Sequence, residues 1–126
     1  MQGNQVFEYA IIRIVPQVER EEFINAGVIL YCKQSAFLQM RHLVHEERLL
    51  ALFPDVDLGC IKANLEAFQQ ICNGNAPGSP IAGLDIASRF RWLTAKRSTI
   101  IQCSPVHPGM CLEPGKVLEQ IFEKMV

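Results

Sequence analysis

The stretch VFEYAIIRIV, residues 6–15, decides the fold of this chain. Its β-branched and aromatic residues are typical of a strand, and Pro16 ends that strand because proline cannot donate to a strand ladder. Side chains alternate between the two faces of a strand, with Tyr9, Ile11, Arg13 and Val15 on one face and Ala10, Ile12 and Ile14 on the other. Because both faces are largely apolar, we expect a central strand, in which Arg13 is the exception.

The segment that follows this strand, VEREEFINAG at residues 18–27, predicts a short helix. Its glutamates stand at the helix start, where the helix dipole favours negative charge. We expect Gly27 to form a left-handed cap and the amide of Asn25 to bond the backbone of the turn. Two strands follow at residues 28–32 and 36–44, and the short polar turn between them predicts a hairpin.

Helical periodicity begins after the hairpin. Residues 45–53 predict a short helix that Pro54 ends, and Asp55 or Asp57 can cap the next helix. That next helix has the clearest pattern in the chain, with apolar residues at spacings of three and four: Leu58, Ile61, Leu65, Phe68 and Ile71.

The last third of the chain completes one domain. A turn-rich connector, NGNAPGSP, precedes a short helix capped by Asp85, a strand at residues 99–104 and a helix at residues 114–126. This order predicts a single α+β domain over residues 1–126, with a mostly antiparallel four-stranded sheet in a ferredoxin-like β-α-β-β-α-β core, extra helices, and the helices packed on one face. The first two strands are joined by about eleven residues, close to the minimum for a parallel pair, so a tighter connection would make them antiparallel and change the topology.

Composition restricts the classes of partner. A net charge of -1 creates no global field that favours nucleic acid or an anionic membrane, so an anion site requires local clustering of basic residues. The start of the chain lacks the basic flank and apolar core of a signal peptide. No apolar run approaches the roughly 18 residues that span a bilayer. We therefore expect a cytoplasmic protein that does not bind membranes.

Neither a metal nor a cofactor is expected. The chain has five cysteines and no C-x-x-C pair: Cys32, Cys60, Cys72, Cys103 and Cys111. In a reducing compartment they are expected to pack as small core residues. His42 and His45 lie three residues apart, but two ligands without a third are a weak metal signal. No Walker loop, dinucleotide-binding motif or H-E-x-x-H motif is present.

Three stretches resemble a known bacterial family. They are YAIIRIVPQVEREEFINAGVILYC, the middle helix leading into the connector, and RFRWLTAKRSTIIQCSPVHPG. On these stretches the chain resembles the family called domain of unknown function 3037. The resemblance implies no activity, cofactor or catalytic residue. It does imply that members are often encoded beside HipA-like kinases. A protein partner, such as a kinase of that class, is therefore expected.

Candidate binding residues gather in RFRWLTAKRSTIIQCSPVH, residues 89–107. Guanidinium groups there match phosphate or carboxylate bidentately, and Trp92 or Phe90 offers a surface on which a base can stack. Arg13 and Arg41 lie among apolar strand residues, and one possible arrangement points both into an anion pocket shared with Arg97. The competing interpretation is a solvated strand face. The full set of candidate binding residues is Arg13, Arg41, Arg89, Arg91, Trp92, Arg97, Ser98, Gln102, Ser104 and His107.

Three functional hypotheses follow. The favoured one is a non-catalytic binding or accessory module that acts through a protein partner. The second is a protein that binds phosphate or nucleic acid through residues 89–107, with nucleic acid the less favoured ligand. The third is a small enzyme in which His107 works with Glu19, Glu22 or Asp85 as acid and base. No nucleophile with a partnered acid surrounds His107, so no catalytic residue is assigned, and a homodimer is compatible with all three hypotheses.

Overall fold

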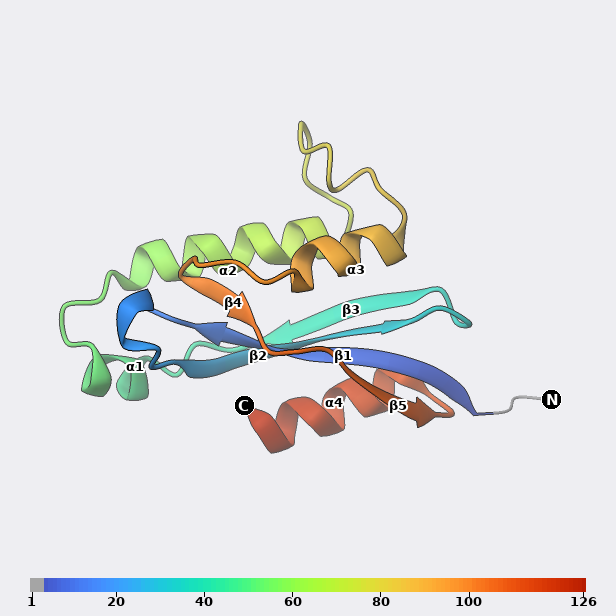
Figure 1. Cartoon of the computed structure of the whole chain (residues 1–126), viewed down its shortest axis with the longest axis horizontal. Coiled ribbons are helices and arrows are strands. Elements are labelled where there is room, and N and C mark those ends of the chain that lie inside the picture. Colours follow the sequence, from blue (N-terminus) through green and yellow to red (C-terminus); the bar gives the residue numbers. More distant parts are fainter. Residues whose placement is uncertain (1–3) are drawn as a thin grey trace.

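The computed structural model describes residues 4–126, which form a five-stranded sheet with helices on both faces (Figure 1). In chain order the elements are β1 (Gln5–Ile14), a 3-10 turn (Val18–Arg20), β2 (Ile24–Cys32), β3 (Phe37–His42), α1 (Glu46–Leu52), α2 (Leu58–Cys72), α3 (Ile86–Thr94), β4 (Ile101–Cys103), β5 (His107–Cys111) and α4 (Pro114–Met125). The α+β class predicted from the sequence is confirmed.

β1 is the centre of the sheet, as its two apolar faces predict. The strand order is β3-β2-β1-β4, and β5 also pairs with β1. On the edge opposite β2, β5 runs along the first half of β1, from Gln5 to Tyr9, and β4 runs along its last residues, from Ile12 to Ile14. All the pairs are antiparallel, and the predicted hairpin of β2 and β3 is confirmed.

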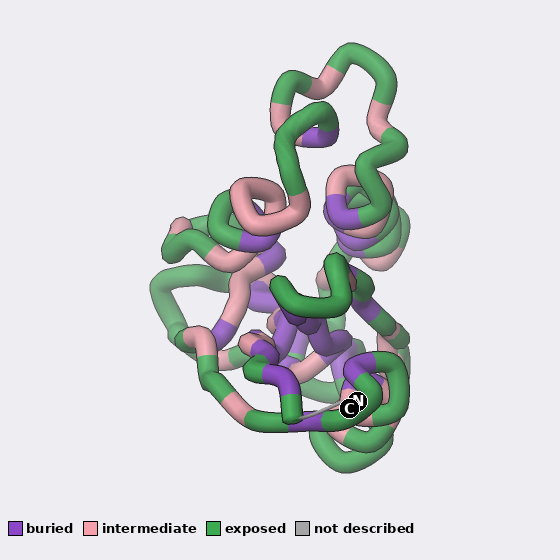
Figure 2. Tube along the Cα trace, turned by 90° about the vertical axis from the view of Figure 1, so that its right-hand side faces the viewer, coloured by how far each residue is buried: buried purple, intermediate pink, exposed green. Residues whose placement is uncertain are grey.

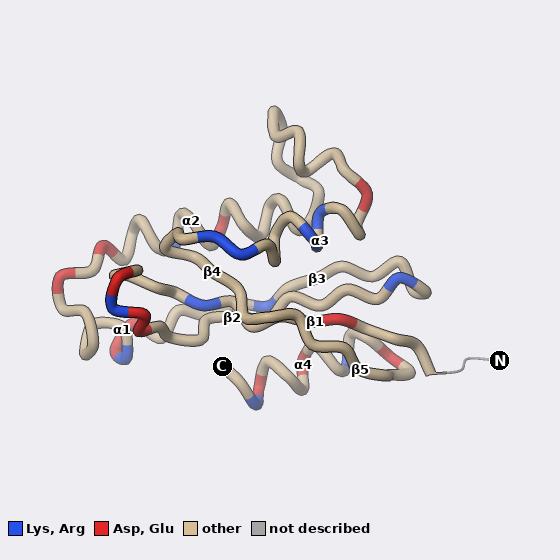
Figure 3. The backbone as a smooth tube through the Cα atoms, in the orientation of Figure 1, with Lys and Arg blue, Asp and Glu red and all other residues tan. Residues whose placement is uncertain are grey.

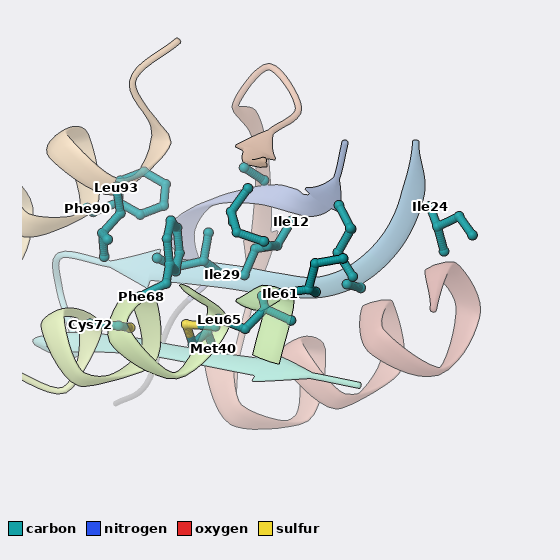
Figure 4. Close-up of a cluster of buried hydrophobic side chains, with 14 of the residues drawn as sticks. Ile12, Ile24, Ile29, Met40, Ile61, Leu65, Phe68, Cys72, Phe90 and Leu93 are labelled. Carbon is teal, nitrogen blue, oxygen red and sulfur yellow. The ribbon is translucent and has the colours of Figure 1, made fainter. Parts of the chain in front are cut away.

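The two faces of β1 contribute side chains to two separate hydrophobic cores. Ala10, Ile12 and Ile14 face α2 and α3, where residues such as Leu65 and Phe90 are fully buried (Figure 4). Phe7 and Ile11 face the other way and pack, with Val28 and Leu30 of β2, against Leu118 of α4. The expectation of helices on one face only was therefore wrong. The amphipathic α4 covers the second face, because the odd-numbered residues of β1 are apolar as well.

The predicted helix at residues 18–27 was also wrong, and with it the ferredoxin-like order. Only Val18–Arg20 forms a 3-10 turn, which Glu21 closes in the left-handed conformation with φ 58°. β2 then begins at Ile24 and returns beside β1, pairing Ile14 with Ile24. A connection this short cannot carry a helical crossover, so β1 and β2 are adjacent and antiparallel.

Gly27 and Asn25 are strand residues and not turn residues. A Cβ atom on Gly27 would lie 2.5 Å from the backbone oxygen of Arg41 in β3, so the glycine permits a close approach of the two strands. Asn25 pairs with Arg13 across the β1–β2 ladder, and its side-chain amide donates to the carbonyl of Met125. The expected roles of these residues in a cap and a turn are therefore corrected.

The fifth strand, β5, was missed because it contains Pro108 and Gly109. Proline is tolerated at this position because β5 pairs with β1 on one side only. Gly109 lies against the ring of Phe7, where an added Cβ would come within 2.4 Å of the ring. The sheet therefore has five strands, and not the four that were predicted.

The prediction for α2 is confirmed. Asp57 caps the helix, with its carboxylate accepting from the amide of Cys60 at 3.0 Å. Ile61, Leu65 and Phe68 are buried against the sheet. The connector between α2 and α3 projects from the body of the molecule and is mostly exposed (Figure 2). Within residues 4–126, no helix combines the length and apolar character that crossing a bilayer demands.

Candidate functional site

Two adjoining cavities of about 270 and 460 Å³ lie where β1 and β4 meet the segment that follows α3. Four residues line both of them: Arg13, Lys96, Arg97 and Gln102. We call these two cavities together the basic cavity. Figure 3 shows basic residues along the segment that follows α3 and on the strands beside it, whereas acidic residues gather in the turn after β1.

Strand pairing brings Arg13 and Gln102 together. They are direct partners in the antiparallel β1–β4 ladder, so their side chains leave the same face of the sheet side by side. The β1–β2 register shifts between Ile12 and Arg13, which leaves Ala26 as an extra residue in β2. Such a bulge twists the strand locally and changes the direction of the neighbouring side chain. Arg13 lies beside β4 near the end of β1.

The end of α3 supplies the other two basic residues. Ala95 follows the helix with extended dihedrals, φ -60° and ψ 142°, so the chain leaves the helix and runs toward β4. Lys96 and Arg97 come immediately after this residue. Arg97 is held in place twice, because it donates to the carbonyl of Trp92 and its guanidinium carbon lies 4.4 Å from the centroid of the Trp92 ring.

The basic cavity carries an excess of positive charge, because three basic residues and one carboxylate line it. Within residues 4–126, no carboxylate lies within ion-pair distance of Arg13, Lys96 or Arg97. The guanidinium of Arg13 stacks over the ring of Phe23 at 4.1 Å, and its buried Nε atom has no hydrogen-bond partner. Glu21 is the carboxylate that lines the smaller cavity. Because a buried donor without a partner is costly, this arrangement favours an incoming acceptor, and guanidinium groups prefer an anionic one.

Cys103 and Ser104, which line the larger cavity, are not activated as nucleophiles. Burial raises the pKa of Cys103 to about 12, against the lowering influence of Arg97 and Arg13, so its thiol stays protonated at neutral pH. The buried hydroxyl of Ser104 accepts from the amide of Ile11 and donates to the carbonyl of Pro105. Cys103 is therefore not available as a thiolate, and the hydroxyl of Ser104 is engaged by the backbone.

The predicted binding residues divide into two groups. The structure brings five of them to the basic cavity: Arg13, Arg97, Ser98, Gln102 and Ser104. The other arginines have partners elsewhere. Arg41 pairs with Glu119 of α4, Arg91 pairs with Glu8 at 2.7 Å, and Arg89 donates to the carbonyl of Leu84 at 2.7 Å. The suggested convergence of Arg13 with Arg97 is therefore present, but Arg41 lies outside it.

The two aromatic candidates also differ. Phe90 is fully buried and stacks on Tyr31, so it cannot receive a base. Trp92 is 38% exposed and borders the basic cavity through Arg97.

Lys96 and Phe23 also line the basic cavity, but they were not among the binding residues predicted from the sequence. The neighbouring Arg97 was a usable signal for Lys96. No signal pointed to Phe23, because its contact with Arg13 depends on the return of β2.

The structure does not bring Glu19 or Glu22 to His107. This residue lies opposite Tyr9 in the β1–β5 ladder, with the two ring centroids 5.4 Å apart. Glu19 and Glu22 follow the other end of β1, about 15 Å farther along the strand, whereas proton transfer needs hydrogen-bond reach. Hydrogen bonds from Ser88 lower the pKa of Asp85, which stands at the start of α3.

The residues that are described show no assembled metal site. His42 contacts the side-chain oxygen of Gln69 at 3.2 Å, whereas His45 contacts the carbonyl of Val126 at 2.7 Å. Their rings are therefore engaged by different elements. Over residues 4–126, no three histidine, cysteine or acidic side chains come together as metal ligands would.

The resemblance seen in the sequence is supported by comparison with family models. The model described as "Protein of unknown function (DUF3037)" matches residues 9–126. The chain belongs to this family. The residues of the basic cavity all lie within the matched range, so this DUF3037 member carries the site inside the family domain. No curated protein and no solved structure matches the chain.

Proposed function

We propose that this protein is a non-catalytic binding module that holds an anionic group, a phosphate or a carboxylate, in the basic cavity. The observation that supports it is the convergence of Arg13, Lys96 and Arg97 around Gln102 without a carboxylate at ion-pair distance. Planar guanidinium groups recognise such anions through paired hydrogen bonds, and the amide of Gln102 supplies a further donor.

Calorimetric titration with inorganic phosphate at low ionic strength tests this function. We expect Arg97→Ala to weaken phosphate binding by about tenfold to a hundredfold, because a hydrogen bond to a charged group contributes about 1.5–3 kcal/mol. The affinity of the unmodified protein should fall as salt is added, since ions screen the cavity. Arg48→Ala is the matched control, because Arg48 is an exposed arginine of α1 that lines neither part of the cavity. Equal affinities in the two variants would remove the cavity from consideration.

An accessory role through a protein partner is a second candidate function, and an exposed apolar strip supports it. Val6 and Met110 are direct neighbours in the β1–β5 ladder, 57% and 59% exposed, and Leu112 follows at the end of β5. Neighbouring large apolar side chains at a sheet edge are typical of protein-binding surfaces. The partner that the family resemblance suggests is a HipA-like kinase.

Co-expression with a HipA-like kinase, the class of partner that the resemblance suggests, tests the accessory role. We expect the two chains to co-purify in fixed ratio, and Met110→Glu to abolish the complex by placing a charge in the apolar strip. Leu84→Glu is the control, because Leu84 is also exposed but lies in the connector before α3. If both variants retained the kinase, or if both lost it equally, the strip would not be the binding surface.

A further inference from the structure

A third cavity, of about 480 Å³, lies beside the basic cavity between α2 and the segment that leads into β4. Its walls are mainly apolar and include Phe68 and Ile71 of α2, Trp92 of α3 and Ile100. We call this cavity the aromatic groove. The polar side chains of Asn64 and Thr99 lie at its border. It therefore offers flat apolar surface together with a few hydrogen-bonding groups, as sites for ring-shaped ligands commonly do.

Arg97 joins the aromatic groove to the basic cavity. It is the residue that lines all three cavities. Its guanidinium lies over the Trp92 ring and also bonds the carbonyl of Trp92, so it stands at the boundary between the charged and the apolar surface. A ligand held by Arg97 at its anionic end can therefore place its remaining atoms in the groove.

We propose that the ligand is a nucleoside phosphate, with its phosphate in the basic cavity and its base in the aromatic groove beside Trp92. This inference rests on the anion-binding function proposed above. Stacking on an aromatic side chain contributes affinity for any planar base, and arginine matches the phosphate. The ligand is a free nucleotide and not a strand, because the chain has a net charge of -1 and Arg91 of α3 is paired with Glu8, which leaves fewer free cations to follow a phosphate backbone.

Titrations of the whole protein with adenosine 5′-monophosphate, inorganic phosphate and adenosine test the proposal. We expect the nucleotide to bind about tenfold tighter than phosphate, in keeping with the stacking of one base. Trp92 is the single tryptophan of the chain, so its fluorescence should change with the nucleotide and much less with phosphate. Equal affinities for nucleotide and phosphate would overturn the nucleotide proposal and leave anion binding standing. No binding of either would overturn both.

Substitution of Trp92 distinguishes the contribution of the base to affinity from that of the phosphate. In calorimetry, Trp92→Leu should lower the affinity for the nucleotide to the affinity for phosphate. Phosphate binding itself should be retained, because the carbonyl that holds Arg97 belongs to the backbone. Trp92→Phe keeps a ring and should retain most of the nucleotide preference. A single-stranded oligonucleotide that bound tenfold tighter than the nucleotide would overturn the proposal of a free ligand. A preference that survived in Trp92→Leu would overturn the placement of the base.

Discussion

A single glycine sets how closely β2 and β3 can approach. Gly27 pairs with His42 in the β2–β3 ladder, and a Cβ atom there would lie 2.5 Å from the Arg41 oxygen and 3.0 Å from the His42 Cβ. The closer of these atoms belongs to the backbone, which cannot rotate away as a flexible side chain can. The position therefore requires glycine because of the neighbouring strand and not because of its own dihedral angles.

Gly27→Ala should destabilise the protein by about 1–3 kcal/mol, the usual cost of overpacking. Urea unfolding followed by circular dichroism measures the change. The control is Gly83→Ala, because a Cβ on Gly83 would lie 3.8 Å from the nearest atom and should change stability by less than about 0.5 kcal/mol. Equal unfolding midpoints for the two variants would show that β3 moves away at no cost.

Arg13 is the residue that couples the fold to the candidate site. Its neighbours Ile12 and Ile14 are fully buried in the core under α2 and α3, so the alternation of the strand sends Arg13 to the opposite face. There it meets Phe23 from the loop before β2 and Gln102 from β4. The apolar strand thus holds the backbone of Arg13 rigidly while its guanidinium borders the cavity.

At the scale of elements, α4 decides that the sheet is enclosed on both faces. Its apolar side chains cover Phe7, Ile11, Val28 and Leu30, which would otherwise form an exposed apolar face. Arg41 of β3 strengthens the contact, because it pairs with Glu119 and lies 4.6 Å from the ring of Phe122. We therefore expect α4 to unfold together with the sheet.

Leu118→Ala should lower the free energy of unfolding by about 2–5 kcal/mol, because Leu118 is almost fully buried between α4 and the sheet. Urea denaturation should still show one transition, at a lower midpoint. Leu112→Ala provides the comparison, because Leu112 is 55% exposed and should change stability by less than about 0.5 kcal/mol. A separate early loss of helix signal in Leu118→Ala would mean that α4 is an independent appendage.

The success of prediction also differed from element to element. α2 could be predicted from its stripe of apolar residues, because one helix face packs on one surface and local spacing records that face. β5 could not, because its proline and glycine are tolerated through contacts with β1, which lies far away in the sequence. The glutamates of residues 19–22 likewise suggested a helix, but the return of β2 beside β1 overrode that local preference.

At the scale of the whole molecule, the candidate site is a product of long-range pairing. Arg97, Ser98 and Gln102 were all predicted binding residues, and their closeness in sequence made a common site a reasonable expectation. Arg13 joins them because β4 pairs antiparallel with the end of β1, whereas Arg41 is directed to α4. Alternation along a strand predicts which face a side chain occupies, but it does not predict which strand will lie beside it.

Local patterns in the chain were sufficient for the α+β class, the central β1 strand, the β2–β3 hairpin and the helix α2. Each of these depends on the spacing of apolar residues or on a neighbouring turn, both of which are properties of a few consecutive residues. The strand order, the fifth strand, the helix on the second face and the convergence of Arg13 with Lys96, Arg97 and Gln102 were decided only by the tertiary structure. They depend on register and packing between segments distant in sequence, where the free energy comes from burial shared by several elements and not from the preference of any one.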